Sequence, residues 1–121
     1  MKSRELERAQ HIQSCLDGLS GGDLLTKYTD RLKGAPAELM DNGLLQTLAF
    51  FHSKKEVEYG RIAGDIEGWL AKCGLLAAQD SPRALAALDA APYRRCSEEA
   101  IAWLNLAKRL AAARVTMRGP S

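Results

Sequence analysis

The stretch that decides the fold is Asn42-Gly43-Leu44-Leu45-Gln46-Thr47-Leu48-Ala49-Phe50-Phe51-His52-Ser53, followed by Lys54-Lys55. Asparagine is a favoured helix cap, and the residues from Gly43 to His52 leave little polar surface. A helix that is apolar nearly all round is normally buried on several sides. We therefore expect a helix here, capped by Asn42 and placed at the centre of the fold.

Apolar residues also recur at helical spacing before this stretch. The pattern predicts a first helix over residues 4–18 with Ser3 as its cap, interrupted by the glycines of residues 18–22. A second helix should begin with Asp23 as cap and end near Gly34. Pro36 then suits the first turn of a short third helix.

The clearest apolar stripe of the chain follows Lys55. It predicts a helix that Gly74 stops, with an inner face of Tyr59, Ile62, Ala63, Ile66, Trp69, Leu70 and Cys73. Ser81-Pro82 predicts a short helix reaching Leu88, with serine as cap. The last helix should run from Pro92 to about Val115, with Ser97, Glu98 and Glu99 near its start, where acids complement the helix dipole.

No segment alternates convincingly with period two, and 121 residues suffice for one core. We predict a single all-α domain over residues 1–121, a bundle of five to seven helices with residues 1–3 and 116–121 frayed. No stretch approaches the ~20 apolar residues of a membrane span, and the charged start does not resemble a signal peptide. Three cysteines far apart support neither a disulfide framework nor zinc, so we expect a cytoplasmic protein with no membrane partner.

Catalytic motifs are absent from the sequence. His11 and His52 are the only histidines, and the glycines of residues 18–22 lack the lysine of a phosphate-binding loop. Glu58 and Asp65 bracket Arg61 at helical spacing and predict an exposed ladder of ion pairs. We expect no enzyme, no metal, no cofactor and no small-molecule substrate.

Positive charge is the remaining functional signal, although the formal net charge is only +2. No acid follows Glu99, so the end of the chain should carry a positive field that can follow a phosphate backbone. Lys108 lies at the edge of the last helix's apolar arc and Arg109 opposite it, which makes them the first candidates for RNA contact. The further candidates are Lys54, Lys55, Arg94, Arg95, Lys27 and Arg31.

Each further candidate has an ordinary explanation as well. Lys54 and Lys55 can simply complement the dipole at a helix end, and Asp23 and Asp30 can neutralise Lys27 and Arg31. Tyr93, next to Arg94, can meet a base or fill the core. The alternative to an RNA-binding protein is a helical adaptor that binds only proteins and whose cations are solvated.

Two blocks of residues resemble a known family. Pro36, Asn42-Gly43-Leu44, Gln46 through Phe50 and Ser53-Lys54 are similar to a signature of the small subunit of type III-B CRISPR effector complexes, the Cmr (RAMP module) complexes. The second block is Tyr93, Glu99-Ala100, Trp103-Leu104 and Lys108-Arg109-Leu110-Ala111, which looks like the family's closing helix. The similarity spans roughly residues 25–115, so Arg4 and Arg8 lie outside it.

The resemblance implies an all-helical subunit without catalytic activity, acting in antiviral defence. Its partners would be other Cmr subunits, further copies of itself stacked into a filament, the guide RNA and the target RNA. By position, Lys54, Lys108 and Arg109 become the leading RNA contacts, and Asn42 and Gln46 would fix the fold. Specificity would come from base pairing, so the protein need read only backbone and shape.

Overall fold

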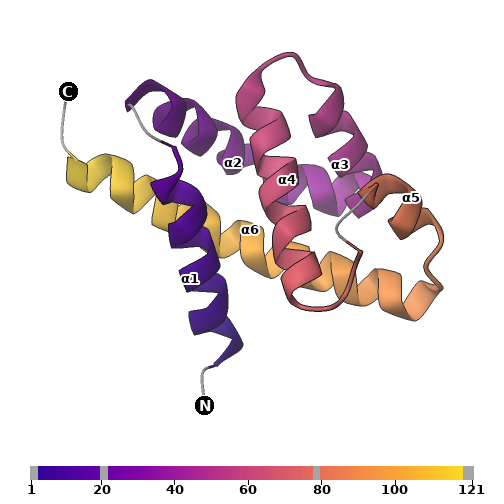
Figure 1. Ribbon diagram of the computed structural model, residues 1–121. Helices are drawn as coiled ribbons and strands as arrows, with labels where there is room; N and C mark the ends of the chain where they lie inside the picture. The colour runs from indigo at the N-terminus through magenta and orange to yellow at the C-terminus, as the bar shows by residue number, and fades with distance from the viewer. Residues whose placement is uncertain (1–2, 20–21, 78–79, 119–121) are drawn as a thin grey trace.

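The computed structural model describes residues 3–19, 22–77 and 80–118 (Figure 1). Over these residues the chain forms helices and no strand. The six helices are α1 Arg4–Asp17, α2 Gly22–Asn42, α3 Leu44–Ser53, α4 Val57–Lys72, α5 Ser81–Ala86 and α6 Ala90–Arg118. The predicted all-α bundle of five to seven helices is confirmed. Of the ends expected to fray, residues 1–2 and 119–121 lie outside the described residues, while Ser3 caps α1 and residues 116–118 belong to α6.

The long helix α6 is the support of the bundle (Figure 1). Helices α1 and α2 pack along it, α4 packs on α2 and α3, and α5 covers α3. One continuous core joins them, and its largest fully buried side chains are Trp69, Trp103, Tyr28, Ile12, Leu16, Leu32, Leu44, Leu48, Ile62, Ile66, Leu70 and Leu85. Among the described residues, none of the helices combines the length and apolarity that crossing a membrane requires.

Helix α1 begins as the sequence predicts. The Ser3 hydroxyl accepts a hydrogen bond from the Leu6 amide at 3.2 Å, which satisfies one of the amides left free in the first turn. The helix ends at Asp17, and the Gly18 amide closes its last turn on backbone carbonyls. Of the five residues expected to interrupt the chain here, Ser20 and Gly21 lie outside the described residues.

Helix α2 corrects two predictions, since it runs without a break from Gly22 to Asn42 with Pro36 inside it. The expected end near Gly34 and the separate short helix are wrong. The buried stripe of Leu32, Ala35 and Leu39 continues across both residues, and its packing outweighs the one backbone hydrogen bond that proline removes. Asp23 is also not a cap, because it lies inside the first turn.

The turn into α3 rests on Gly43 and not on Asn42. Asn42 is the last residue of α2, while Gly43 is the N-cap of α3 with φ 85° and no side-chain cap. Only glycine adopts this backbone conformation readily, so the predicted asparagine cap is wrong. The free amide of Leu45 is satisfied from another helix, because the Tyr93 hydroxyl of α6 accepts its hydrogen bond at 2.9 Å.

Helix α3 is less central than its composition suggests. Leu44, Thr47, Leu48 and Phe51 are buried, but the other face is exposed and Phe50 is 41% exposed. The helices with the most extensive packing are α2 and α6. The prediction that α3 forms the centre of the fold is therefore wrong, since α3 covers only one side of the core.

The last three helices follow the predicted stripes with shifted ends. In α4 the buried face is as expected, with Tyr59 and Cys73 at its half-buried margins, and Gly74 ends it with φ 74°. Helix α5 has Asp80 as N-cap and stops at Ala86, before Leu88, and Ser81 is its buried first residue and not a cap.

Helix α6 begins two residues before Pro92 and extends past Val115 to Arg118. No acid therefore lies in its first turn. The predicted dipole role of Glu98 and Glu99 is wrong, and Glu99 has a different partner, described below.

Candidate nucleic-acid interface

Two of the predicted RNA contacts, Arg31 and Lys54, meet around one aromatic ring. The Lys54 ammonium lies 5.2 Å from the Tyr59 ring centroid and 4.7 Å from that of Phe50. The Arg31 guanidinium carbon lies 4.8 Å from the Tyr59 centroid. We call Arg31, Phe50, Lys54, Glu58 and Tyr59 the corner cluster. It joins α2, the end of α3 and the start of α4.

The two cations of the corner cluster differ in whether a carboxylate neutralises their charge. Arg31 Nε lies 3.1 Å from Glu58 Oε2, and this hydrogen bond raises the pKa of the guanidinium. Glu58 is buried, so the predicted exposed ladder with Arg61 is wrong, although Arg61 does lie 3.9 Å from the half-buried Asp65. Lys54 has no carboxylate within ion-pair distance among the described residues, and two rings hold it instead.

The outer face of α6 carries a second group of cations: Lys108, Arg109, Arg94 and Arg95. None of the four forms an ion pair with the described part of the chain. Lys108 is half-buried, as its edge position predicts, and Arg109 is exposed with its guanidinium 3.4 Å from the carbonyl of Asn105 on its own helix. Lys108 and Arg109 therefore carry charge that no ion pair within the described residues cancels, whereas the exposed Glu98 lies one turn from Arg94 and Arg95.

The remaining candidates differ in their surroundings. Lys27 is exposed and lies 3.3 Å from Asp23, so this carboxylate neutralises it, as the second of the two explanations predicts. Lys55 is exposed beside Lys54 without an acid partner among the described residues. Within these residues no hydrogen bond or ion pair joins the corner cluster to Lys108 or Arg109. The candidates are thus spread over several parts of the surface, since even on α6 Arg94 and Arg95 lie about four turns before Lys108 and Arg109.

The signature residues of the resemblance occupy varied positions. Pro36 is half-buried within α2, while Asn42 and Gln46 are exposed and make no side-chain hydrogen bond to the described residues. The structure thus gives no support to their expected role in fixing the fold. Tyr93 is half-buried and bonds the α3 backbone, so of its two alternatives the structure favours packing over contact with a base.

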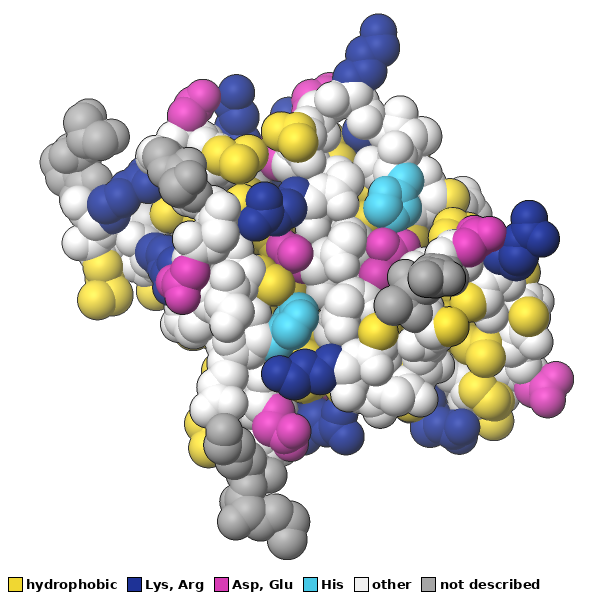
Figure 2. All heavy atoms as spheres, viewed as in Figure 1, with side chains coloured by type: hydrophobic (Ala, Val, Ile, Leu, Met, Phe, Trp, Pro, Cys, Tyr) yellow, Lys and Arg dark blue, Asp and Glu magenta, His cyan; other side chains and the backbone are white. Residues whose placement is uncertain are grey.

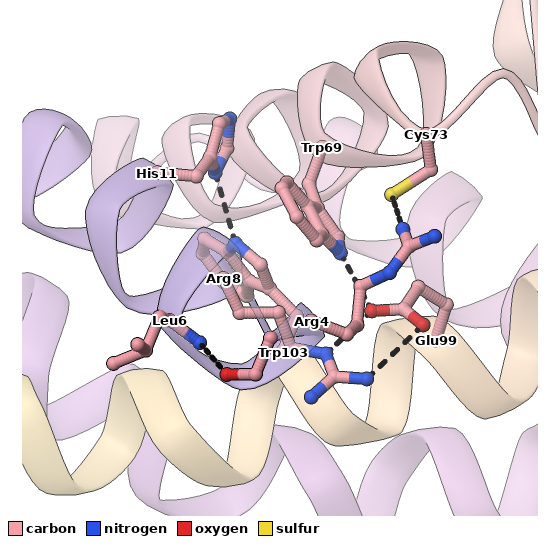
Figure 3. Close-up of polar contacts among 9 residues, drawn as sticks. Arg4, Leu6, Arg8, His11, Trp69, Cys73, Glu99 and Trp103 are labelled. Atoms are coloured by element: carbon pink, nitrogen blue, oxygen red, sulfur yellow. Dashed lines mark hydrogen bonds and ion pairs between the residues drawn. The ribbon is translucent and has the colours of Figure 1, made fainter. Parts of the chain in front are cut away.

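Sequence reasoning missed a polar network where α1, α4 and α6 meet (Figure 3). Glu99 accepts hydrogen bonds from Arg8 and from Trp69 Nε1, the latter at 2.9 Å. Trp103 Nε1 donates to His11 Nδ1 at 3.0 Å. Buried indole N–H groups normally require a partner, so the two tryptophans were the available signal, and Trp69 lies on a predicted inner face.

Electrostatics in this network follow from burial and these bonds. Burial opposes ionisation of Glu99, but hydrogen bonds from Arg8 and Trp69 and the charge of Arg8 outweigh it and lower the pKa. Burial lowers the pKa of His11. Since Nδ1 accepts from Trp103, the neutral ring carries its proton on Nε2.

Arg4 lies beside this network and has no carboxylate partner among the described residues. Its guanidinium donates to Cys73 Sγ at 2.8 Å and lies 5.9 Å from the Trp69 ring centroid. Burial nevertheless raises the pKa of the Cys73 thiol, so the sulfur is protonated near neutral pH.

The chemistry available to the described residues is limited. The three cysteines are free thiols, and burial raises the pKa of Cys15 to about 12. No group of three or more histidine, cysteine or acidic side chains within the described ranges could hold a metal ion. His52 Nε2 lies 3.0 Å from Glu67 at the surface, which is an ordinary ion-pair geometry. On the visible face, cations and acids are interspersed (Figure 2).

Comparison with known proteins gives one family. Residues 4–114 match the model of a family described as CRISPR-associated protein (Cas_Cmr5). This match includes Arg4 and Arg8, which lay outside the resemblance seen in the sequence. No curated protein matches the chain.

Proposed function

The chain belongs to the CRISPR-associated protein (Cas_Cmr5) family, and from this premise we propose that it is a non-catalytic small subunit of an RNA-guided type III-B Cmr effector complex. In this role it stacks with further copies of itself and with other Cmr subunits. It helps to hold the duplex of guide RNA and target RNA for antiviral defence.

The observation that carries the RNA contact is the outer face of α6. From residue 100 to the end of the chain there is no acid, and Lys108 and Arg109 have no carboxylate partner in the described chain. Lysine and arginine on a rigid helix release counterions when they meet phosphates, and this supplies affinity without reading sequence. Lys54, Lys55, Arg94 and Arg95 would add contacts of the same kind, whereas Asp23 and Glu58 compensate Lys27 and Arg31.

The test is charge reversal in the assembled complex. Lys108→Glu/Arg109→Glu should weaken retention of target RNA. If both cations contact phosphates, each should also lower the slope of log affinity against log salt by about 0.7 to 0.9. Arg83→Glu is the matched control, because Arg83 is 87% exposed on α5 and already paired with Asp80. Normal retention and an unchanged slope in the double variant would show that this face does not contact RNA.

A protein-only adaptor is the second candidate, and one surface favours it. Met117, near the end of α6, is 85% exposed. Met117 borders a groove of about 810 Å³ between α1, α2 and α6, floored by Leu16, Leu25 and other apolar side chains. An adaptor predicts that Met117→Lys disrupts assembly of the complex. It also predicts that the Lys108/Arg109 variant assembles and retains RNA normally.

A further inference from the structure

The corner cluster contains an exposed aromatic ring held in a fixed position. The ring centroids of Phe50 and Phe51 lie 6.1 Å apart, and those of Phe51 and Tyr59 lie 5.3 Å apart. Phe51 is only 3% exposed and anchors this row in the core, whereas Phe50 is 41% exposed. The outer ring is thus both accessible and ordered by its neighbours. Binding to this ring would therefore cost little additional side-chain entropy.

A cation lies over the same ring. Lys54 Nζ lies 4.7 Å from the Phe50 centroid, and the lysine stem is half-buried, so the ammonium has a restricted position. An aromatic ring attracts an ammonium but does not cancel its charge as a carboxylate would. The ammonium therefore keeps the capacity to bind an anion. Lys55 is exposed immediately beside it.

The surrounding charges leave Lys54 without an ion-pair partner. Arg31 and the buried Glu58 neutralise each other, and Glu67 lies against His52. Glu56 is exposed beside Lys55, and no carboxylate of the described residues lies within ion-pair distance of Lys54. The patch thus combines an aromatic face and an uncompensated cation, the two elements that bind unpaired nucleotides.

We propose that the corner cluster binds one unpaired nucleotide of RNA, with its base stacked on Phe50 and its phosphate on Lys54. This inference rests on the proposed function and adds a contact that a regular duplex does not make. Inside a duplex the base faces are covered by neighbouring bases, so only an unstacked or single-stranded nucleotide can present a face to the ring. The site tolerates any base, because every base has an aromatic face.

Photocrosslinking separates base stacking from phosphate contact. Complexes are assembled with target RNAs that carry 5-iodouridine at single positions along the guide-paired segment and its flanks, then irradiated. Peptides crosslinked to RNA are identified by mass spectrometry. At one or more positions the crosslink should map to Phe50. Crosslinks that map only to other residues at every position would overturn the proposal.

Variants of Phe50 test whether the crosslink depends on its aromatic ring. Phe50→Leu removes the aromatic face but keeps an apolar side chain, and it should abolish the crosslink, whereas Phe50→Tyr should retain it. Base stacking contributes about 1–3 kcal/mol per base, so Phe50→Leu should weaken binding of a single-stranded oligouridine roughly 5-fold or more. Binding of an abasic oligonucleotide of equal length should not change. Equal losses for both ligands would contradict stacking.

The two proposals fail in different ways. If wild-type complexes retain target RNA and respond to the Lys108/Arg109 reversal, but no crosslink reaches the corner cluster, only the stacking site is wrong. If the complexes retain RNA equally well with and without those cations and the salt slope is unchanged, the proposed α6 contact is wrong. Since Phe50 is exposed, its variants should fold, and a thermal melt of each confirms this before binding is measured.

Discussion

Replacing Glu99 by alanine should destabilise the protein more than any other single change of a charged residue in the described network. Its carboxylate joins three helices, since it lies on α6 and accepts hydrogen bonds from Arg8 of α1 and Trp69 of α4 (Figure 3). The Glu99 side chain is 15% exposed and the Arg8 side chain 19% exposed. Water can therefore replace the lost bonds only in part.

The expected loss follows from these groups. A hydrogen bond to a charged group contributes about 1.5–3 kcal/mol, and an orphaned buried donor costs about 1–3 kcal/mol. Removing one partner of a fully buried ion pair costs about 3–5 kcal/mol. Because this pair retains some exposure, we expect Glu99→Ala to lower the free energy of unfolding by roughly 3 kcal/mol. Glu99→Gln keeps an acceptor for Trp69 and should cost about half as much.

Urea denaturation at neutral pH measures these differences. Glu98→Ala is the matched control, because Glu98 is the exposed neighbour of Glu99 with no ion pair to the described residues, and it should change stability by less than about 0.5 kcal/mol. An equal, small effect of Glu98→Ala and Glu99→Ala at unchanged m-value would refute the reasoning.

The Glu99 contribution should also depend on pH. Burial raises the pKa of Glu99, but the hydrogen bonds from Arg8 and Trp69 lower it by more. The pKa in the folded protein therefore lies below the unfolded value of about 4.3. A depressed carboxylate pKa adds stability above the unfolded pKa, and that stability is lost as pH falls through the folded pKa. The stability difference between wild type and Glu99→Gln should therefore be constant near neutrality and shrink below about pH 4.

Two further predictions follow from single positions. Burial lowers the pKa of His11, and the Trp103 indole donates to the unprotonated Nδ1 of that ring. The free energy of unfolding should therefore fall as pH decreases below about 6.5, the unfolded value for histidine. Urea denaturation of His11→Gln at several pH values should show a weaker dependence on pH. Gly43→Ala should cost roughly 1–3 kcal/mol because of its φ of 85°, whereas Gly34→Ala, in mid-helix with open space around its Cα, should stabilise by up to about 1 kcal/mol. Equal shifts of the two glycine variants in thermal melts would contradict the backbone argument.

Periodic signals predicted most of the helices, and Gly74 ends α4 as predicted, but the stop signals inside α2 misled. The stripe of α4 predicted its buried face because that face is long and regular, whereas in α1 only Ile12 and Leu16 are buried and Leu6 is exposed. In α2, Gly34 and Pro36 indicated a break, because glycine and proline inside a helix cost about 1 and about 3 kcal/mol relative to alanine. The spacing of Leu32, Ala35 and Leu39 across both residues was the stronger signal, since burial of that stripe holds the helix together.

The candidate site was predictable only where partners are close in sequence. Asp23, four residues before Lys27, was named as its possible neutraliser and is its partner. Arg31 pairs with neither of the two acids named for this pair of cations, Asp23 and Asp30, since its partner is Glu58, 27 positions away on another helix. The bond between Arg8 and Glu99 spans 91 positions. No periodicity encodes such pairs, because they depend on how helices cross after the core has formed.

The kind of partner that a cation finds decides its value for RNA binding. Arg31 and Lys54 approach the same Tyr59 ring, and in the sequence they look equivalent. A buried carboxylate holds Arg31 and cancels its charge, so a phosphate would have to compete with Glu58 for it. Rings hold Lys54 and restrict its ammonium without cancelling its charge. If this corner binds RNA as proposed, its electrostatic attraction comes from Lys54 and its neighbour Lys55, and Arg31→Ala should weaken RNA binding less than Lys54→Ala.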